Sequence, residues 1–401
     1  MVPKDWTTKT LSEIVKEKIS YGIVQAGPHI PGGVPYIKSS DVRGTINPEK
    51  LQKTSQAIHF KYRRSSVHPG DIVISLRGNI GECAIVPNSL PEANLTQGTA
   101  RISVDNDQCN YFHYYQLASE PIRNKVKTLS KGSTFKEISL EDLRKVTVLC
   151  PSIQEQKKIS QILTSWDKAI TIAEKLLANS QQQKKALMQQ LLTGEKRLAG
   201  FKQAWSKVTV SNMGSISSGG TPDTTKNEYW DGGINWLTPT DVTSLKSRYV
   251  FSTNKTISEK GLKNSSAKML PSGALLICTR ATIGAMAIST TEIATNQGFK
   301  NLVPNAEFSV EFLYYLFTFN VKELVRRSSG STFLELSKSD FEKLTFLCPC
   351  IDEQHKIASV LIAADDAVSV QQQKLNHLKQ EKKALMQQLL TGKRRVKVDA
   401  A

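Results

Sequence analysis

The sequence holds two acidic arrangements that could support catalysis. Glu155-Gln156-Lys157 resembles the ExK half of a nuclease site, and Asp365-Asp366 is a carboxylate pair that could hold a metal ion. The first falls at the start of an expected helix, where a Glu caps free N–H groups and complements the helix dipole. Its counterpart in a second copy of the segment is Glu353-Gln354-His355. Helical periodicity places Asp366 on an outer face, so we predict neither a catalytic residue nor a metal site.

Other catalytic motifs are missing from the sequence. It contains no GxxxxGK[ST] phosphate loop, no GxGxxG, no HExxH and no Asn/Asp-Pro-Pro-aromatic motif of amino-methyltransferases. Its six cysteines show no CxxC spacing, and the close pair Cys348-Pro349-Cys350 corresponds to Cys150-Pro151-Ser152 in the other copy. We expect these thiols to pack as small buried hydrophobes.

The net charge points to a polyanionic partner. The chain has 53 Lys and Arg against 36 Asp and Glu, a formal charge of +17. It contains no run of eighteen apolar residues, and its first residues do not form a signal peptide. We expect a cytoplasmic protein without a membrane partner.

Two arginines stand in matching places beside predicted turns. Arg77 and Arg280 each follow a strand, within reach of Asn79 and Thr282 respectively. Arg forms bidentate hydrogen bonds with guanine or phosphate, which suggests a DNA contact. A structural salt bridge is an equally good interpretation of either residue.

Short polar strings and basic clusters extend this candidate surface. The polar strings suit phosphate or adenine edges, although turn capping also explains them, and the basic clusters suit phosphates. The residues that we predict to bind DNA are Lys38, Ser39, Ser40, Arg63, Arg64, Arg77, Asn79, Gln97, Arg101, Lys131, Thr238, Thr240, Arg280, Thr282, Asn296, Gln297, Lys300, Arg326 and Arg327.

The elements that must position these residues belong to an α+β fold. Short β-branched runs separated by Gly, Pro and Asn predict strands, and a helix follows them near Asn110–Ser119. Strands in one cluster with a helix after them favour a compact α+β body. The predicted strands cover 34–38, 71–76, 82–86 and 99–104.

The chain is a tandem duplication in which a long helix closes each copy. The segment KKALMQQLLTG occurs at Lys184–Gly194 and again at Lys382–Gly392, and Gly132-Ser133-Thr134-Phe135 returns as Gly330-Ser331-Thr332-Phe333. Apolar residues recur in alternating steps of four and three from Ile159 and from Ile357, which is a heptad pattern. Because each helix spans on the order of 60 Å, the connectivity favours an antiparallel pair that holds two globular bodies apart.

The duplication also sets the predicted boundaries. The globular bodies repeat more loosely than the helices, as two readers of different targets would. The boundaries are 1–150 and 199–348 for the two globular domains, 151–198 and 349–395 for the helical spacers, and 396–401 for a tail.

Together these features resemble the specificity subunit of a type I restriction–modification enzyme. The resemblance covers nearly the whole chain and is carried mainly by the helices. Each copy has a Gly-Ser-Thr turn, a Leu-Cys-Pro-x-Ile-x-Glu-Gln helix start and a helix that ends in KKALMQQLLTG.

The resemblance implies two target-recognition domains, each a twisted, mainly antiparallel sheet with helices, related by a pseudo-twofold axis. Each domain would read one half of a bipartite site in double-stranded DNA. The antiparallel coiled coil would set the gap and dock two methyltransferase subunits, and restriction/translocase subunits would join through the complex. S-adenosylmethionine, ATP and Mg would belong to those partners, with no cofactor in this chain.

Three alternatives remain open from the sequence. One is a coiled-coil scaffold that does not bind DNA, for which the charge would be incidental. Another is the DNA-binding subunit of a different methyltransferase-based phage-defence system. A fused nuclease–methyltransferase would need catalytic motifs, and the sequence lacks them.

Overall fold

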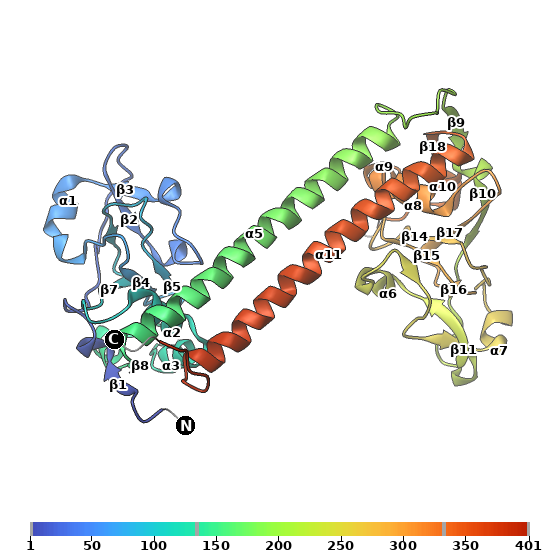
Figure 1. Ribbon diagram of the computed structural model, residues 1–401. Coiled ribbons are helices and arrows are strands. Elements are labelled where there is room, and N and C mark those ends of the chain that lie inside the picture. The colour runs from blue at the N-terminus through green and yellow to red at the C-terminus, as the bar shows by residue number, and fades with distance from the viewer. Residues whose placement is uncertain (1–2, 133–135, 331–333, 399–401) are drawn as a thin grey trace. The chain divides into compact units, whose positions relative to one another are not determined.

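A computed structural model describes residues 3–132, 136–330 and 334–398. The repeated turns at 133–135 and 331–333 and the last three residues of the predicted tail lie outside the described residues. The chain divides into two compact units (Figure 1). Unit 1 is Met1–Glu174 with Gln373–Ala401, and unit 2 is Lys175–Gln372. This division cuts both long helices, whereas the sequence boundaries gave each helix a segment of its own.

Unit 1 has the predicted α+β character, with every predicted strand present. Its strands form three small sheets, ordered β1-β8, β3-β2-β6 and β5-β4-β7. All pairings are antiparallel except that of β2 with β6. The strands are β1 (Thr7–Thr10), β2 (Val34–Ile37), β3 (Gln52–Thr54), β4 (Ile72–Ser75), β5 (Cys83–Ile85), β6 (Asn94–Leu95), β7 (Thr99–Ile102) and β8 (Thr147–Cys150), and the short helices are α1 (Gln56–Lys61), α2 (Asn110–Ala118), α3 (Glu120–Thr128) and α4 (Leu140–Arg144).

Unit 2 repeats this plan with a larger central sheet. Its sheets are β10-β17-β14-β15-β12, β13-β11-β16 and β18-β9. The parallel pair of β11 with β16 matches that of β2 with β6 residue for residue, at an offset of 200. The strands are β9 (Ser206–Thr209), β10 (Gly214–Ser218), β11 (Trp230–Leu237), β12 (Tyr249–Val250), β13 (Thr256–Ile257), β14 (Leu275–Cys278), β15 (Met286–Ser289), β16 (Ala294–Thr295), β17 (Phe299–Pro304) and β18 (Thr345–Cys348), and the short helices are α6 (Pro239–Ser244), α7 (Glu259–Lys263), α8 (Val310–Phe319), α9 (Val321–Arg326) and α10 (Lys338–Glu342).

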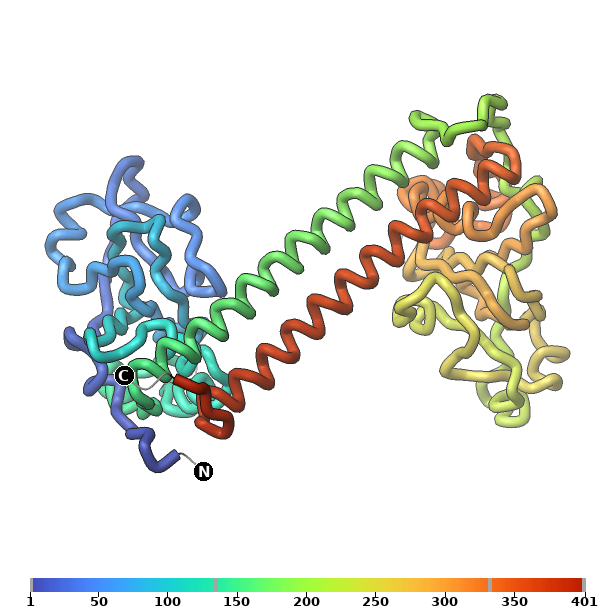
Figure 2. Tube along the Cα trace, viewed as in Figure 1, coloured from blue at the N-terminus to red at the C-terminus, as the bar shows by residue number. Residues whose placement is uncertain are grey.

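The two long helices are α5 (Ile153–Leu192) and α11 (Ile351–Leu389). Both pass through unit 1 and unit 2, and within each unit they run antiparallel (Figure 2). In unit 1, Asp167 and Glu174 of α5 pair with Lys382 and Lys379 of α11. In unit 2, Lys184 pairs with Asp365. The predicted heptad seam is confirmed, since none of its positions is exposed in either helix; they are Ile159, Leu163, Trp166, Ile170, Ala173, Leu177, Ser180, Lys184, Leu187 and Leu191, and 198 residues later Ile357, Leu361, Ala364, Val368, Gln371, Leu375, Leu378, Lys382, Leu385 and Leu389.

The glycine that ends each repeat has a positive φ, as a residue just beyond a helix C-terminus often does. Gly194 has φ 75° and Gly392 has φ 73°. In unit 1 the chain after Gly392 then returns to the segment before β1, where Arg395 binds Asp5 with N–O distances of 2.9 and 2.6 Å.

A buried glutamate in the first turn of each long helix binds side chains of its own unit. Glu155 is 2% exposed and accepts hydrogen bonds from the Trp6 indole (3.1 Å) and from Arg395 (2.7 and 2.9 Å). Glu353 is bound in the same way by Trp205 and Arg197 in unit 2. Both glutamates lie in the first turn of a helix, as predicted, and the Ser152 hydroxyl caps α5 by accepting from Glu155 N (3.3 Å). Their carboxylates serve tertiary contacts, because burial requires an anion to be paired.

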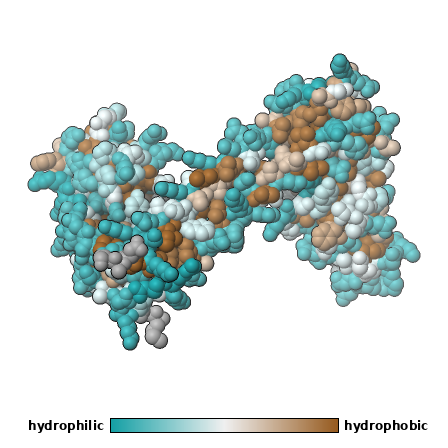
Figure 3. All heavy atoms as spheres, viewed as in Figure 1, coloured by the Kyte–Doolittle hydropathy of each residue, from teal (hydrophilic) through white to brown (hydrophobic). Residues whose placement is uncertain are grey.

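Side chains on the surface are mostly polar. On the face drawn in Figure 3, hydrophilic atoms cover most of each unit and apolar atoms occupy smaller areas. No helix in the described part of the chain is long and apolar enough to cross a membrane.

Candidate nucleic-acid interface

In unit 1 the turn after β4 carries the first candidate arginine. Leu76 is buried, and Gly78 has φ 65°, a left-handed conformation that a glycine adopts without strain. Asn79 donates from Nδ2 to the Ser39 carbonyl (3.2 Å) and accepts from Arg43 (2.7 Å). These contacts join the turn to the polar string that follows β2.

The same turn borders an open surface pocket of about 380 Å³. Four of the predicted DNA-binding residues line it, namely Lys38, Ser39, Arg77 and Gln97. They come from the ends of β2, β4 and β6 and are brought together because these strands end on one side of the unit. The pocket therefore groups two cations with two neutral hydrogen-bonding side chains.

Unit 2 places its second arginine in a matching turn. Arg280 is exposed, and Ala281 stands where unit 1 has Gly78, with φ 60°. A left-handed conformation costs a residue with a Cβ roughly 1–2 kcal/mol, so the fold holds a strained residue at this turn. A Cβ on Gly298 would lie 3.9 Å from that of Arg280, so the turn lies next to Asn296 and Gln297.

The two arginines differ in their partners. Arg77 Nε lies 2.9 Å from Glu137 Oε2, so the two side chains form an ion pair. The Nε–H group itself does not meet the geometry of a hydrogen bond. In unit 2 the equivalent Glu335 is instead 3.8 Å from the Nζ of Lys300. Within residues 3–132, 136–330 and 334–398, no carboxylate pairs with Arg280. The salt-bridge interpretation is confirmed for Arg77, and the DNA contact of Arg280 stays a prediction.

Two predicted contacts lie in the interior. Arg101 is 7% exposed and donates to the Ser66 carbonyl (2.5 Å) and to Glu17. Lys300 is 5% exposed, and this burial lowers the pKa of its ammonium group, while Glu335 acts in the opposite direction. Both side chains are therefore buried, which contradicts the prediction that they form surface contacts. Alternation along β7 and β17 gave no sign that a charged residue would face inward.

Several polar candidates are used by their own turns. Thr238 caps α6 by accepting from Asp241 N (3.4 Å) while its hydroxyl donates to Asp241 (2.6 Å). Asn296 accepts from Gly298 N (2.9 Å), and Ser40 donates to Asp41 (3.3 Å). Gln297 accepts from the Thr221 hydroxyl, and no acceptor among the described residues binds its amide NH₂. Thr240 and Thr282 are exposed beside these turns.

The basic candidates lie on the surface of their units. Arg63 covers the Phe60 ring at 4.7 Å, and Arg64 lines an open pocket with Lys18 and Arg144. Lys131 is 83% exposed and lies 3.4 Å from Asp142. In unit 2, Arg326 and Arg327 share Glu323 at 2.8 and 3.2 Å.

Sequence reasoning missed Arg43 and Thr221. Arg43 binds Asn79, and Thr221 orients Gln297, but 36 and 76 residues separate the partners. The only signal in the sequence was the short distance of Arg43 from the polar string at 38–40.

The thiols and carboxylates of the described residues show no arrangement for chemistry. Burial raises the pKa of Cys83 and Cys348 to about 12 and that of Cys150 and Cys278 to about 11, as expected for thiols that pack in a core. Within those residues no group of three or more His, Cys, Asp or Glu could hold a metal ion.

Comparison with known proteins places this architecture in a family. The family described as "Type I restriction modification DNA specificity domain" matches residues 3–179 and 202–380, once for each copy. The type I restriction enzyme MjaIX specificity subunit of Methanocaldococcus jannaschii is 38% identical over 166 residues, which cover 41% of this chain and 38% of that protein.

Two further relatives extend along the whole chain. The putative type I restriction enzyme MjaX specificity subunit of the same organism is 24% identical over 422 residues, 99% of this chain and 95% of that protein. A crystal structure of a type I restriction-modification S subunit from M. genitalium shares the fold with a TM-score of 0.62 and 15% identity, covering 97% and 96% of the two chains. The protein therefore belongs to the type I restriction–modification DNA specificity family.

Proposed function

We propose that this chain is the DNA-recognition subunit of a type I restriction–modification complex, without catalytic activity of its own. Each unit reads one half of an asymmetric bipartite site in double-stranded DNA. The paired helices set the unspecified gap between the halves. The complex acts in the cytoplasm, where its DNA substrate is found.

The observation that carries this proposal is the matched recognition turn. In each unit an arginine follows a strand that pairs with its neighbour over three residues: Arg77 follows β4, and Arg280 follows β14. A turn with a glutamine lies beside each arginine, and the two glutamines, Gln97 and Gln297, are 200 residues apart. The frame is the same in the two units, but the neighbouring side chains differ: Gly78 against Ala281, and Ala100 against Lys300. One frame with different side chains suits two readers of different half-sites, because base edges are distinguished by side-chain donors and acceptors.

The helix ends support a second part of the proposal, that two methyltransferase subunits dock on the chain. Folding explains identical residues in the seam, because both seams must pack. Folding does not explain identical exposed residues, and Lys185, Ala186 and Gln189 are exposed in α5, as are their counterparts in α11. A shared partner at both positions explains that identity. S-adenosylmethionine, ATP and Mg then belong to the partner subunits, and restriction/translocase subunits join through the complex.

The test is reconstitution with the methyltransferase subunit of the same host, called the modification subunit. The complex should methylate adenines at one bipartite sequence, and mapping of the modified bases should return two defined half-sites and a fixed gap. A complex that forms but methylates no defined sequence would support the scaffold alternative.

A further inference from the structure

A basic groove lies in unit 1 beside the end of α11. Its volume is about 1070 Å³, and it runs between α3, β8 and the last turns of α11. Six lysines line it, namely Lys125 and Lys127 from α3 and Lys379, Lys382, Lys383 and Lys393 from α11 and the residues after it.

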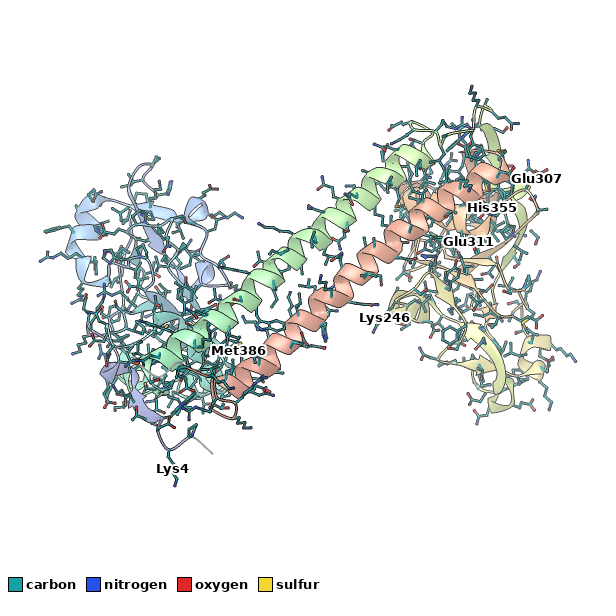
Figure 4. The ribbon with its side chains drawn as sticks, viewed as in Figure 1. Lys4, Lys246, Glu307, Glu311, His355 and Met386 are labelled. Carbon is teal, nitrogen blue, oxygen red and sulfur yellow. The ribbon has the colours of Figure 1, made fainter. Side chains whose placement is uncertain are left out.

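The groove combines this charge with an apolar floor. Ile122, Val148, Met386 and Leu390 contribute apolar side chains, and Leu390 is 5% exposed. Met386 is labelled in Figure 4, on the part of α11 that belongs to unit 1. An apolar floor with a charged rim is typical of a surface for an amphipathic partner segment, whereas a site for the DNA backbone needs only the charge.

Some of the lysines are already paired and others are not. Lys379, Lys382 and Lys383 pair with Glu174, Asp167 and Glu120. Lys125 donates to the Thr147 hydroxyl (2.8 Å), and no carboxylate of the described residues pairs with Lys127. Lys125 and Lys127 are exposed, so the α3 side of the groove presents positive charge to a ligand.

The counterpart region of unit 2 has a different charge. Gly81 packs on Arg123 and Gly284 packs on Val321, which fixes the correspondence of α3 with α9 at an offset of 198. At this offset Lys125 corresponds to Glu323 and Lys127 to Val325. In and after the long helices, Lys379 corresponds to Gln181 and Lys393 to Glu195. Lys382 and Lys383 correspond to lysines, Lys184 and Lys185. In α9, Lys322 stands in the place of Asn124. Three lysines and two glutamates thus stand where unit 1 has six lysines, Arg123 and one glutamate.

The apolar floor differs as well. Met188, the counterpart of Met386, is 9% exposed and belongs to the hydrophobic core of unit 2. Met386 is only partly buried against its cluster. The methionine is available to a ligand in unit 1 and is used for packing in unit 2.

We infer that the groove of unit 1 binds an acidic amphipathic segment of the modification subunit, and that unit 2 binds the same subunit without this contact. The two docking positions are therefore unequal, although the helix ends are identical in sequence. This inference rests on the proposed function, since it assumes that the modification subunit docks on both units. Charge at a docking surface governs association rate and salt dependence, so the position in unit 1 is the tighter and the more salt-sensitive.

In the test, the purified modification subunit is titrated into the full chain, and binding is measured by calorimetry and native mass spectrometry. The expected result is two binding steps, of which the tighter weakens between about 50 and 300 mM salt. The double variant Lys125→Glu/Lys127→Glu should weaken that step by roughly tenfold or more and leave the second step unchanged. The reciprocal variant Glu323→Lys/Val325→Lys should tighten the second step.

The control is Lys16→Glu/Lys50→Glu, which reverses two exposed lysines of unit 1 outside the groove. This control should bind as the parent does, and thermal melting should show that all variants fold. Two equal steps that neither salt nor the groove variant affects would overturn the inference. So would a groove variant that keeps both steps but loses affinity for non-specific duplex DNA, because the groove would then be a phosphate site. A parent chain that binds no modification subunit at all would instead contradict the proposed function itself.

Discussion

In unit 2 the Nζ of Lys300 lies 3.8 Å from Oε1 of Glu335. In unit 1 the equivalent carboxylate, Glu137, is held by Arg77, because Ala100 stands in the place of Lys300. Lys300 thus pairs with Glu335, and no carboxylate in the described part of the chain pairs with Arg280.

Lys300→Met should therefore weaken DNA binding although Lys300 itself is buried. Without the ammonium group, Glu335 pairs with Arg280 and competes with the DNA. The expected loss is about 1 kcal/mol, which corresponds to several-fold in Kd for the half-site read by unit 2. Lys300→Met/Glu335→Gln should restore binding. Unchanged affinity in a normally folded Lys300→Met variant would show that Lys300 does not govern Arg280.

Arg280→Ala and Arg77→Ala should each impair recognition of one half-site only. A contact to a base is worth about 1–3 kcal/mol, and removal of a phosphate contact instead lowers the salt slope by about one. The loss should be smaller for Arg77, because binding DNA through that side chain first breaks its ion pair with Glu137. Gel-shift titrations on duplexes with either half-site altered measure both effects. Parent-like binding by both variants would refute the assignment.

The stability of unit 1 should depend on pH through His113. Its side chain is fully buried, and burial lowers the pKa of this imidazole from 6.5 to about 4 against the opposing effect of Asp107. As the pH falls, His113 takes up a proton in the unfolded chain before it does so in the folded chain. The stability that neutral His113 contributes is therefore complete above pH 6.5 and is lost as the pH falls toward 4. The free energy of unfolding should drop by about 2 kcal/mol between pH 7 and pH 5.

Unit 2 offers the control for this pH dependence, since Leu313 stands in the matching place. Hydrogen exchange at pH 7 and pH 5 should show the drop in the α2 core of unit 1 and not in the α8 core of unit 2. His113→Leu should remove it. An equal drop in both units, or one that persists in the variant, would assign it to other groups.

The buried carboxylates Glu155 and Glu353 predict local destabilisation. Arg395→Ala leaves Glu155 buried beside Trp6 with one partner fewer, at a cost of about 2 kcal/mol in unit 1, since the arginine is half exposed. Arg197→Ala should do the same to unit 2 alone. Arg395→Ala/Glu155→Gln should lose less than Arg395→Ala, because no unpaired charge remains. Chemical denaturation with unit-specific hydrogen exchange measures this, and equal losses in the single and double variants would argue against a charge effect.

Residue patterns predicted the elements well and the contacts less well. Heptad spacing and the repeat predicted both long helices to within a few residues, because periodicity and helix ends are local properties. Turn residues likewise located β4, β5 and the arginine turns. The sequence could not predict that Arg101 and Lys300 point inward, or that Glu155 meets Arg395, because these depend on partners up to 240 residues away.

The sequence alone could not predict how the charge of the groove differs between the units, because that comparison needs the correspondence of α3 with α9, which the fold shows. KKALMQQLLTG is identical in both copies, so this segment by itself would give two equal docking surfaces. Their difference comes from α3, α9 and the residues after the helices. The stoichiometry of partners remains a proposal.

The central claim is that two readers share one chain and that the paired helices set the gap between their half-sites. One heptad inserted between Glu174 and Lys175 and another between Gln372 and Gln373 lengthens both helices where the two units meet in sequence. A heptad preserves the seam and adds ~10 Å, about three base pairs of DNA. Mapping of methylated adenines should return both original half-sites, separated by a gap that is longer by up to about three base pairs. Altered half-sites with an unchanged gap would contradict the account.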